Sequence, residues 1–110
     1  MTFRLPYVVM ALCLLMPGVG AAQMSPSEQR GSTFVRANCS TCHATDKVSA
    51  SPLKIAPPFR ELHLRYPVES LQEALVEGIR TGHVNMPEFR LDPGQASDVI
   101  AYLKDVGTLT

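Results

Sequence analysis

The sequence predicts an all-α fold. Three stretches place apolar residues at intervals of three and four, the spacing of one helix face. Two of these stretches begin with a capping box, and the proline-rich stretch between the first and the second has no regular period. A chain of 110 residues is long enough for one domain and too short for a second hydrophobic core.

The first 22 residues have the layout of a secretory signal peptide. The single charge of Arg4 precedes an apolar run over residues 5–16, and Gly20, Ala21 and Ala22 resemble a cleavage site. Twelve apolar residues are too few to cross a bilayer, which needs about 20. We therefore expect residues 1–22, with Cys13, to be removed. The mature domain, residues 23–110, is then exported to the periplasm without stable membrane insertion.

Export changes the charge and the cysteine count of the chain. The mature part keeps 9 of 10 basic residues and all 10 acidic residues, because only Arg4 is lost. A net charge of −1 gives no electrostatic case for binding nucleic acid. Two cysteines remain, Cys39 and Cys42, and both enter an oxidising compartment.

The first helix begins after Ser25, which caps it, and Glu28 completes the capping box. We expect this helix to run to about Cys39. A glycine inside a helix lowers its stability, so the glycine in this one indicates a close approach by another helix. Its inward stripe consists of Gly31, Phe34, Val35 and Asn38.

Two further helices are expected after an irregular loop over residues 45–58 and a short helix over Phe59–Leu64. One begins near Pro67 and ends at Gly82, and its apolar stripe comprises Val68, Leu71, Ala74, Leu75 and Ile79. The other opens on a capping box at Asp92–Gln95 and ends at Gly107. Its predicted buried residues are Ala96, Val99, Ile100, Leu103 and Val106.

Cys39, Cys42 and His43 form a C-x-x-C-H motif. A disulfide across so short a loop would remove little chain entropy, zinc would need a further pair of ligands, and a thioredoxin-like switch would need a βαβ context. A c-type haem needs two thiols for its two vinyl groups and an adjacent imidazole for its iron, and the motif supplies all three. We interpret it as the attachment site of one haem c, whose apolar ring would also complete a small core.

With this motif in place, the mature chain resembles a class I c-type cytochrome, the small bacterial mono-haem kind, over nearly its whole length. The residues that carry the resemblance are CSTCH, Gly31, APPF at Ala56–Phe59, NMPEF at Asn85–Phe89, and Tyr102. The resemblance implies a cytochrome c fold, with three main helices and short helical turns packed around one covalent haem. It also implies that Gly31 and the Phe34/Val35 pair meet the Tyr102/Leu103 face where the first and last helices cross. By the same resemblance, the carbonyl of Pro57 accepts a hydrogen bond from the His43 imidazole.

Met86 is the candidate for the second axial ligand of the iron. It lies between two expected helices, and Asn85 and Pro87 oppose helix formation around it. In the family that the chain resembles, a methionine followed by proline in this loop is the usual distal ligand. His83 is the alternative, which would give bis-histidine ligation and a lower potential, whereas His63 has no ligand context.

Ligation by His43 and Met86 would fill both axial positions of the iron. The expected function is one-electron transfer between a donor and an acceptor protein, without catalysis, by a monomer that docks transiently. Two alternatives stay open. The chain could be a cytochrome subunit of a periplasmic dehydrogenase or oxidase complex, or a haem sensor or peroxidase with an open distal site.

Overall fold

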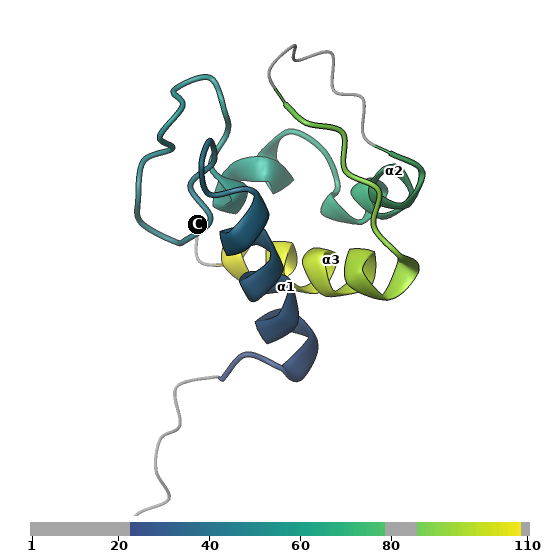
Figure 1. The fold of residues 1–110 in the computed structure, drawn as a ribbon. Coiled ribbons are helices and arrows are strands. Elements are labelled where there is room, and N and C mark those ends of the chain that lie inside the picture. The colour runs from purple at the N-terminus through teal and green to yellow at the C-terminus, as the bar shows by residue number, and fades with distance from the viewer. Residues whose placement is uncertain (1–22, 79–85, 109–110) are drawn as a thin grey trace, which may run out of the picture.

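The computed structural model describes residues 23–78 and 86–108. Within these ranges the fold is all-α. Three α-helices, α1 (Pro26–Asn38), α2 (Leu71–Glu77) and α3 (Pro93–Gly107), are accompanied by two 3₁₀ segments, η1 (Phe59–Leu64) and η2 (Val68–Ser70). Helix α3 is the central element, because α1, η1, η2 and α2 all contact it (Figure 1).

Both predicted capping boxes are present. In α1, the Glu28 amide donates to Ser25 Oγ at 3.2 Å, and the Ser25 amide donates back to the Glu28 carboxylate at 3.2 Å. In α3, the Gln95 amide donates to Asp92 Oδ1 at 2.8 Å, and the Asp92 amide donates to Gln95 Oε1. These bonds satisfy backbone groups that have no partner within the helix, and they fix where each helix begins.

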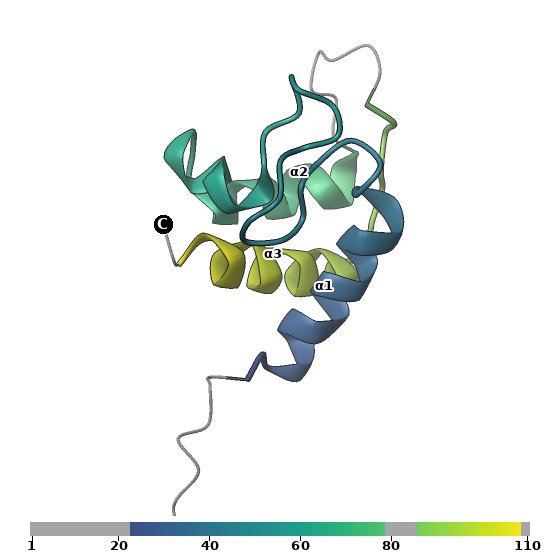
Figure 2. The same cartoon turned by 90° about the vertical axis from the view of Figure 1, so that its left-hand side faces the viewer.

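Helices α1 and α3 cross at Gly31 (Figures 1 and 2). A Cβ atom added to Gly31 would lie 2.0 Å from the carbonyl oxygen of Asp98 and 2.9 Å from Tyr102 Cβ. The two backbones therefore approach more closely than any larger residue allows. This confirms the expectation that Gly31 marks a helix crossing next to Tyr102.

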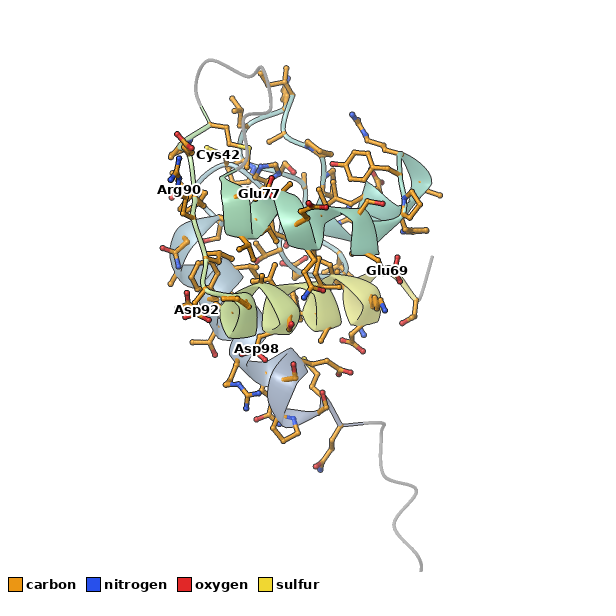
Figure 3. The ribbon with its side chains drawn as sticks, turned by 90° about the vertical axis from the view of Figure 1, so that its right-hand side faces the viewer. Cys42, Glu69, Glu77, Arg90, Asp92 and Asp98 are labelled. Atoms are coloured by element: carbon orange, nitrogen blue, oxygen red, sulfur yellow. The ribbon has the colours of Figure 1, made fainter. Side chains whose placement is uncertain are left out.

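An ion pair between α1 and α3 stabilises the same crossing. Arg30 donates to both carboxylate oxygens of Asp98, at 2.9 and 3.1 Å, and Ser27 Oγ donates to the same carboxylate at 2.7 Å. The hydrogen bonds from Arg30, followed by that from Ser27, lower the pKa of Asp98 below its ordinary value. Figure 3 shows Asp98 on the side of α3 that faces α1 and away from α2.

The core lies on both sides of α3. The five residues predicted to be buried in this helix are buried, and Tyr102 is buried with them. From the other elements, the core receives Val35, Phe59, Leu62, Val68 and Leu91. The short helix predicted over Phe59–Leu64 is present with the same bounds, as the 3₁₀ segment η1.

The prediction for the second helix was wrong at its C-terminal end. Helix α2 ends at Glu77, because Gly78 has a φ of +107°, a left-handed conformation that stops the helix before Gly82. In the described segment that follows residue 85, the Leu91 amide donates to the Leu75 carbonyl of α2 at 2.8 Å. At the other end, Val68–Ser70 is a 3₁₀ turn rather than α-helix.

No helix in the described ranges is long and apolar enough to span a membrane. The predicted signal peptide lies outside these ranges.

Candidate functional site

The NCSTCH stretch forms a tight turn at the end of α1. Cys39 caps the helix, and its amide donates to the Val35 carbonyl at 2.8 Å. The amides of Cys42 and His43 both donate to the Cys39 carbonyl, at 3.2 and 3.0 Å. Because both amides bond to this one carbonyl, the motif forms a compact turn. The two thiols and the imidazole therefore lie together at the C-terminal end of α1.

The two cysteines form no disulfide, and both side chains are half-buried. Burial raises the pKa of the Cys39 thiol to about 11. A cysteine that works as a redox switch has a lowered pKa, because the thiolate is the reactive form. The environment of Cys39 therefore does not suit a thioredoxin-like switch.

His43 is oriented by the proline-rich loop. Its Nδ1 atom lies 2.8 Å from the carbonyl oxygen of Pro57, the pairing that the resemblance implies. A carbonyl only accepts, so Nδ1 must carry the proton of this bond. The neutral imidazole then presents the lone pair of Nε2, which is the form that binds a metal ion.

The loop over residues 45–58 is irregular, as predicted, and hydrogen bonds hold it and its start at several points. Ser51 Oγ accepts from the Ala44 amide at 3.0 Å, and the Leu53 amide donates to the Cys42 carbonyl at 3.1 Å. Arg60 Nη1 donates to the Ser49 carbonyl at 2.7 Å. The buried hydroxyl of Tyr102 donates to the Thr45 carbonyl and so ties the loop to α3.

Asp46 closes a tight turn inside this loop. Its carboxylate accepts from the Ser49 hydroxyl at 2.6 Å, the Ser49 amide at 2.6 Å and the Val48 amide at 2.8 Å. The hydroxyl bond, followed by the two amide bonds, lowers the pKa of Asp46 from 3.8 to about 2. The turn therefore depends on the ionised form of the side chain.

Replacing Asp46 by Asn should make the mature protein less stable near neutral pH, by an amount that depends on pH. Because the folded-state pKa is depressed, the ionised carboxylate stabilises the fold above about pH 3.8, and this contribution is lost as the pH falls towards 2. Thermal unfolding of wild type and Asp46→Asn from pH 7 to pH 2 measures it, with Glu61→Gln as the charge-matched control. A difference in melting temperature that stays constant down to pH 2 would contradict the assignment.

The structure describes two of the three residues considered as a second iron ligand, Met86 and His63. Met86 is half-buried and begins the described segment 86–92, whose Leu91 amide bonds to α2. His83 lies outside the described residues. His63 is exposed on η1, and its Nδ1 would lie 3.1 Å from a Cβ atom added at Gly107, beside the end of α3.

Several apolar side chains around the core, among them those of α2, are only partly covered by the protein. None of the α2 residues is fully buried. The half-buried apolar residues packed against the core are Met24, Phe34, Leu71, Leu75, Val76 and Phe89. Two thiols, an imidazole with Nδ1 engaged, and the incompletely covered apolar side chains of α2 together fit a covalently attached porphyrin. Among the residues that the structure describes, no cluster of three or more His, Cys, Asp or Glu side chains could hold a metal ion directly.

An open hollow at the α1–α3 crossing is a separate feature. It is lined by the α1 residues Arg30, Thr33 and Phe34 and by Gln95 and Asp98 of α3, among others. In Figure 3, Cys42 lies above α3 and Asp98 lies on its lower side, towards α1. The hollow is therefore distinct from the C-x-x-C-H turn.

Sequence reasoning overlooked several residues around the site. It used Phe59 as part of the APPF stretch and as the start of a short helix, whereas the Phe59 ring lies beside the His43 imidazole. The Asp46 turn carries a local signal, since aspartate often bonds to backbone amides two and three residues ahead. The contacts of Arg60 and Tyr102 with the loop have no such local signal.

A comparison with protein-family models gives one match. The family described as Cytochrome c matches residues 28–107, from the first turn of α1 to the end of α3. The chain matches no curated protein and no solved structure. The matched range is well over half of the 110 residues and includes the C-x-x-C-H turn, Pro57 and Met86.

Proposed function

Because the chain belongs to the cytochrome c family, we propose that it is an exported mono-haem cytochrome that carries one electron at a time between redox proteins. The observation that supports this best is the turn at the end of α1. It joins Cys39, Cys42 and His43, and the Nδ1 atom of His43 is engaged by Pro57 at 2.8 Å. Haem attachment needs two thiols and an adjacent imidazole, which this turn supplies. The hydrogen bond to Pro57 gives the imidazole the tautomer that binds iron.

Different residues would attach the haem and bind its iron. Cys39 and Cys42 would form thioethers with its two vinyl groups, and Nε2 of His43 would bind the iron from one side. The Pro57 carbonyl would keep the His43 proton on Nδ1 and raise the basicity of the ligating nitrogen. Met86 would supply the thioether sulfur on the other side.

A bound haem would supply an iron that gains and loses one electron while His43 and Met86 hold it. The chain would supply apolar surroundings that exclude water, through side chains such as Leu75 and Phe89, which are partly buried against the core. A soft thioether ligand and a dry site both favour ferrous iron, which raises the reduction potential. No substrate bond is made or broken in this role, so the protein is not an enzyme.

The proposal extends to where and how the protein works. Residues 1–22 would direct export and be removed, and the mature chain over 23–110 would act in the periplasm as a monomer. Electron-transfer encounters are typically small and short-lived interfaces. The donor and acceptor would therefore dock transiently.

The second candidate is a subunit of a larger redox complex. Val48, Ile55 and Leu64 support it, because their side chains are 86%, 68% and 72% exposed. Single exposed apolar residues are common on monomers, however, and these three come from the loop and η1 rather than from one element. Co-purification of the exported protein with a dehydrogenase or oxidase at fixed stoichiometry would favour the subunit.

Replacement of Met86 tests both the distal ligand and the carrier function. The ferrous wild-type protein should bind almost no carbon monoxide at neutral pH, and the ferric form should show the weak near-infrared band of sulfur-to-iron charge transfer. Met86→Ala should bind carbon monoxide stoichiometrically, lose this band and have a lower reduction potential.

Met24→Ala is the matched control, because Met24 is a half-buried methionine like Met86 but lies before α1. This variant should keep the band and exclude carbon monoxide. Ready carbon monoxide binding by the wild-type protein would refute the carrier function. A low-spin wild type without the band would transfer the role of distal ligand to His83.

A further inference from the structure

We propose that Phe59 is a positioning residue for His43. The hydrogen bond to Pro57 still allows the imidazole to rotate about its Nδ1–H bond, and the Phe59 ring prevents this rotation. The proposal rests on the function proposed above, because it takes His43 as an iron ligand. It concerns how this chain sets the orientation of that ligand.

The contact between the two rings is close, and one of the rings is buried. The centroids of the His43 and Phe59 rings lie 4.8 Å apart, and the ring planes are inclined by 39°. Aromatic pairs interact favourably at this separation. Phe59 is only 8% exposed and belongs to the core cluster, so its ring cannot turn without disturbing packed neighbours.

Three consecutive residues hold His43 and its neighbour. The Pro57 carbonyl accepts from Nδ1, the Phe59 ring lies beside the imidazole, and the Phe59 amide donates to the Ala44 carbonyl at 2.9 Å. Pro58 stands between them with a φ of −58°, which its own ring restricts. The hydrogen bond and the ring contact are therefore fixed relative to each other by a stiff segment.

The two contacts restrict different motions of the imidazole. A hydrogen bond to Nδ1 fixes the direction of one N–H bond, and the ring can still rotate about this direction. A flat, immobile group beside the imidazole opposes that rotation. Groups around a metal ligand that fix its orientation also tune the metal, so the plane of the imidazole should affect the iron.

The test is paramagnetic proton NMR and potentiometry of the matured protein with its haem. The spread of the haem-methyl resonances in the ferric form depends on the plane of the axial imidazole. Phe59→Leu keeps an apolar side chain and removes the flat ring, Phe59→Met does the same with an unbranched chain, and Phe59→Tyr keeps the ring. Val106→Ala is the control for lost core packing, because Val106 is 1% exposed and lies in the same cluster.

We expect Phe59→Leu and Phe59→Met to keep low-spin iron but to change the order of the haem-methyl resonances and shift the reduction potential. Phe59→Tyr and Val106→Ala should retain the wild-type order. Wild-type order in both Phe59→Leu and Phe59→Met would overturn the role of Phe59 and leave the proposed function intact. A wild-type protein that matures without haem would overturn both.

Discussion

The double variant Cys39→Ser/Cys42→Ser should contain no covalently bound haem when it is exported from cells that carry the haem-attachment machinery. Each thiol is expected to hold one vinyl group, so each single variant should keep one thioether and the double variant neither. The measurement is the haem absorbance that stays with the polypeptide after denaturation and extraction with acidic organic solvent.

The sequence offers a matched control for this loss. Cys13 is the remaining one of the chain's three cysteines and lies in the predicted signal peptide. Cys13→Ser should therefore give the full amount of covalent haem. Covalent haem in the double variant would show that the attachment site lies elsewhere.

The loss of haem should also reduce the stability of the fold. A mature chain of this size buries little apolar surface, and all of α2 is only partly covered by protein. We expect the double variant to unfold at a much lower temperature than wild type, with a broader transition in circular dichroism. An unchanged melting temperature would mean that the haem contributes no part of the core.

Gly31→Ala should have the largest effect on stability of any single methyl group added to the helices. The new Cβ would lie 2.0 Å from the Asp98 carbonyl oxygen and 2.7 Å from its carbon, and both of these are backbone atoms. The helices would have to move apart, so we expect a loss of about 2–3 kcal/mol in the free energy of unfolding. For a domain of this size, that corresponds to a decrease in melting temperature of about 10–20 °C.

Gly94→Ala is the control for this prediction. Gly94 also lies in a helix, and an added Cβ atom would meet only the Asp92 carboxylate at 3.3 Å. Alanine is favoured over glycine inside helices by about 1 kcal/mol, so this variant should be neutral or slightly stabilised. If Gly31→Ala were equally stable in thermal unfolding, the close crossing of α1 and α3 would be wrong.

The parts of the fold that local patterns determine could be predicted. The capping boxes at Ser25 and Asp92 use residues three positions apart, and they gave the starts of α1 and α3. The end of α2 could not be predicted in this way. Its apolar spacing continues to Ile79, but Gly78 adopts a left-handed conformation and an added Cβ would meet the side chains of Glu88 and Arg90.

The same distinction applies to the site. The C-x-x-C-H turn is local, and its three donors were identified from spacing alone. The loop beside it is held by Tyr102 through a bond that joins residues 57 positions apart and by Arg60 through one that joins residues 11 apart. Contacts of this kind depend on the packing of η1 and α3, which no local pattern encodes. Pro57 was identified by family resemblance, whereas Phe59 required the structure.

Covalent haem is the central claim, and the optical spectrum and intact mass of the denatured wild-type protein test it most directly. The full-length chain should be exported with the haem-attachment machinery present, then unfolded and separated from all non-covalent material. We predict a red polypeptide that carries one haem per chain, with the spectrum of a haem whose vinyl groups have been saturated. A colourless polypeptide, or a haem that separates from the unfolded chain, would contradict the account.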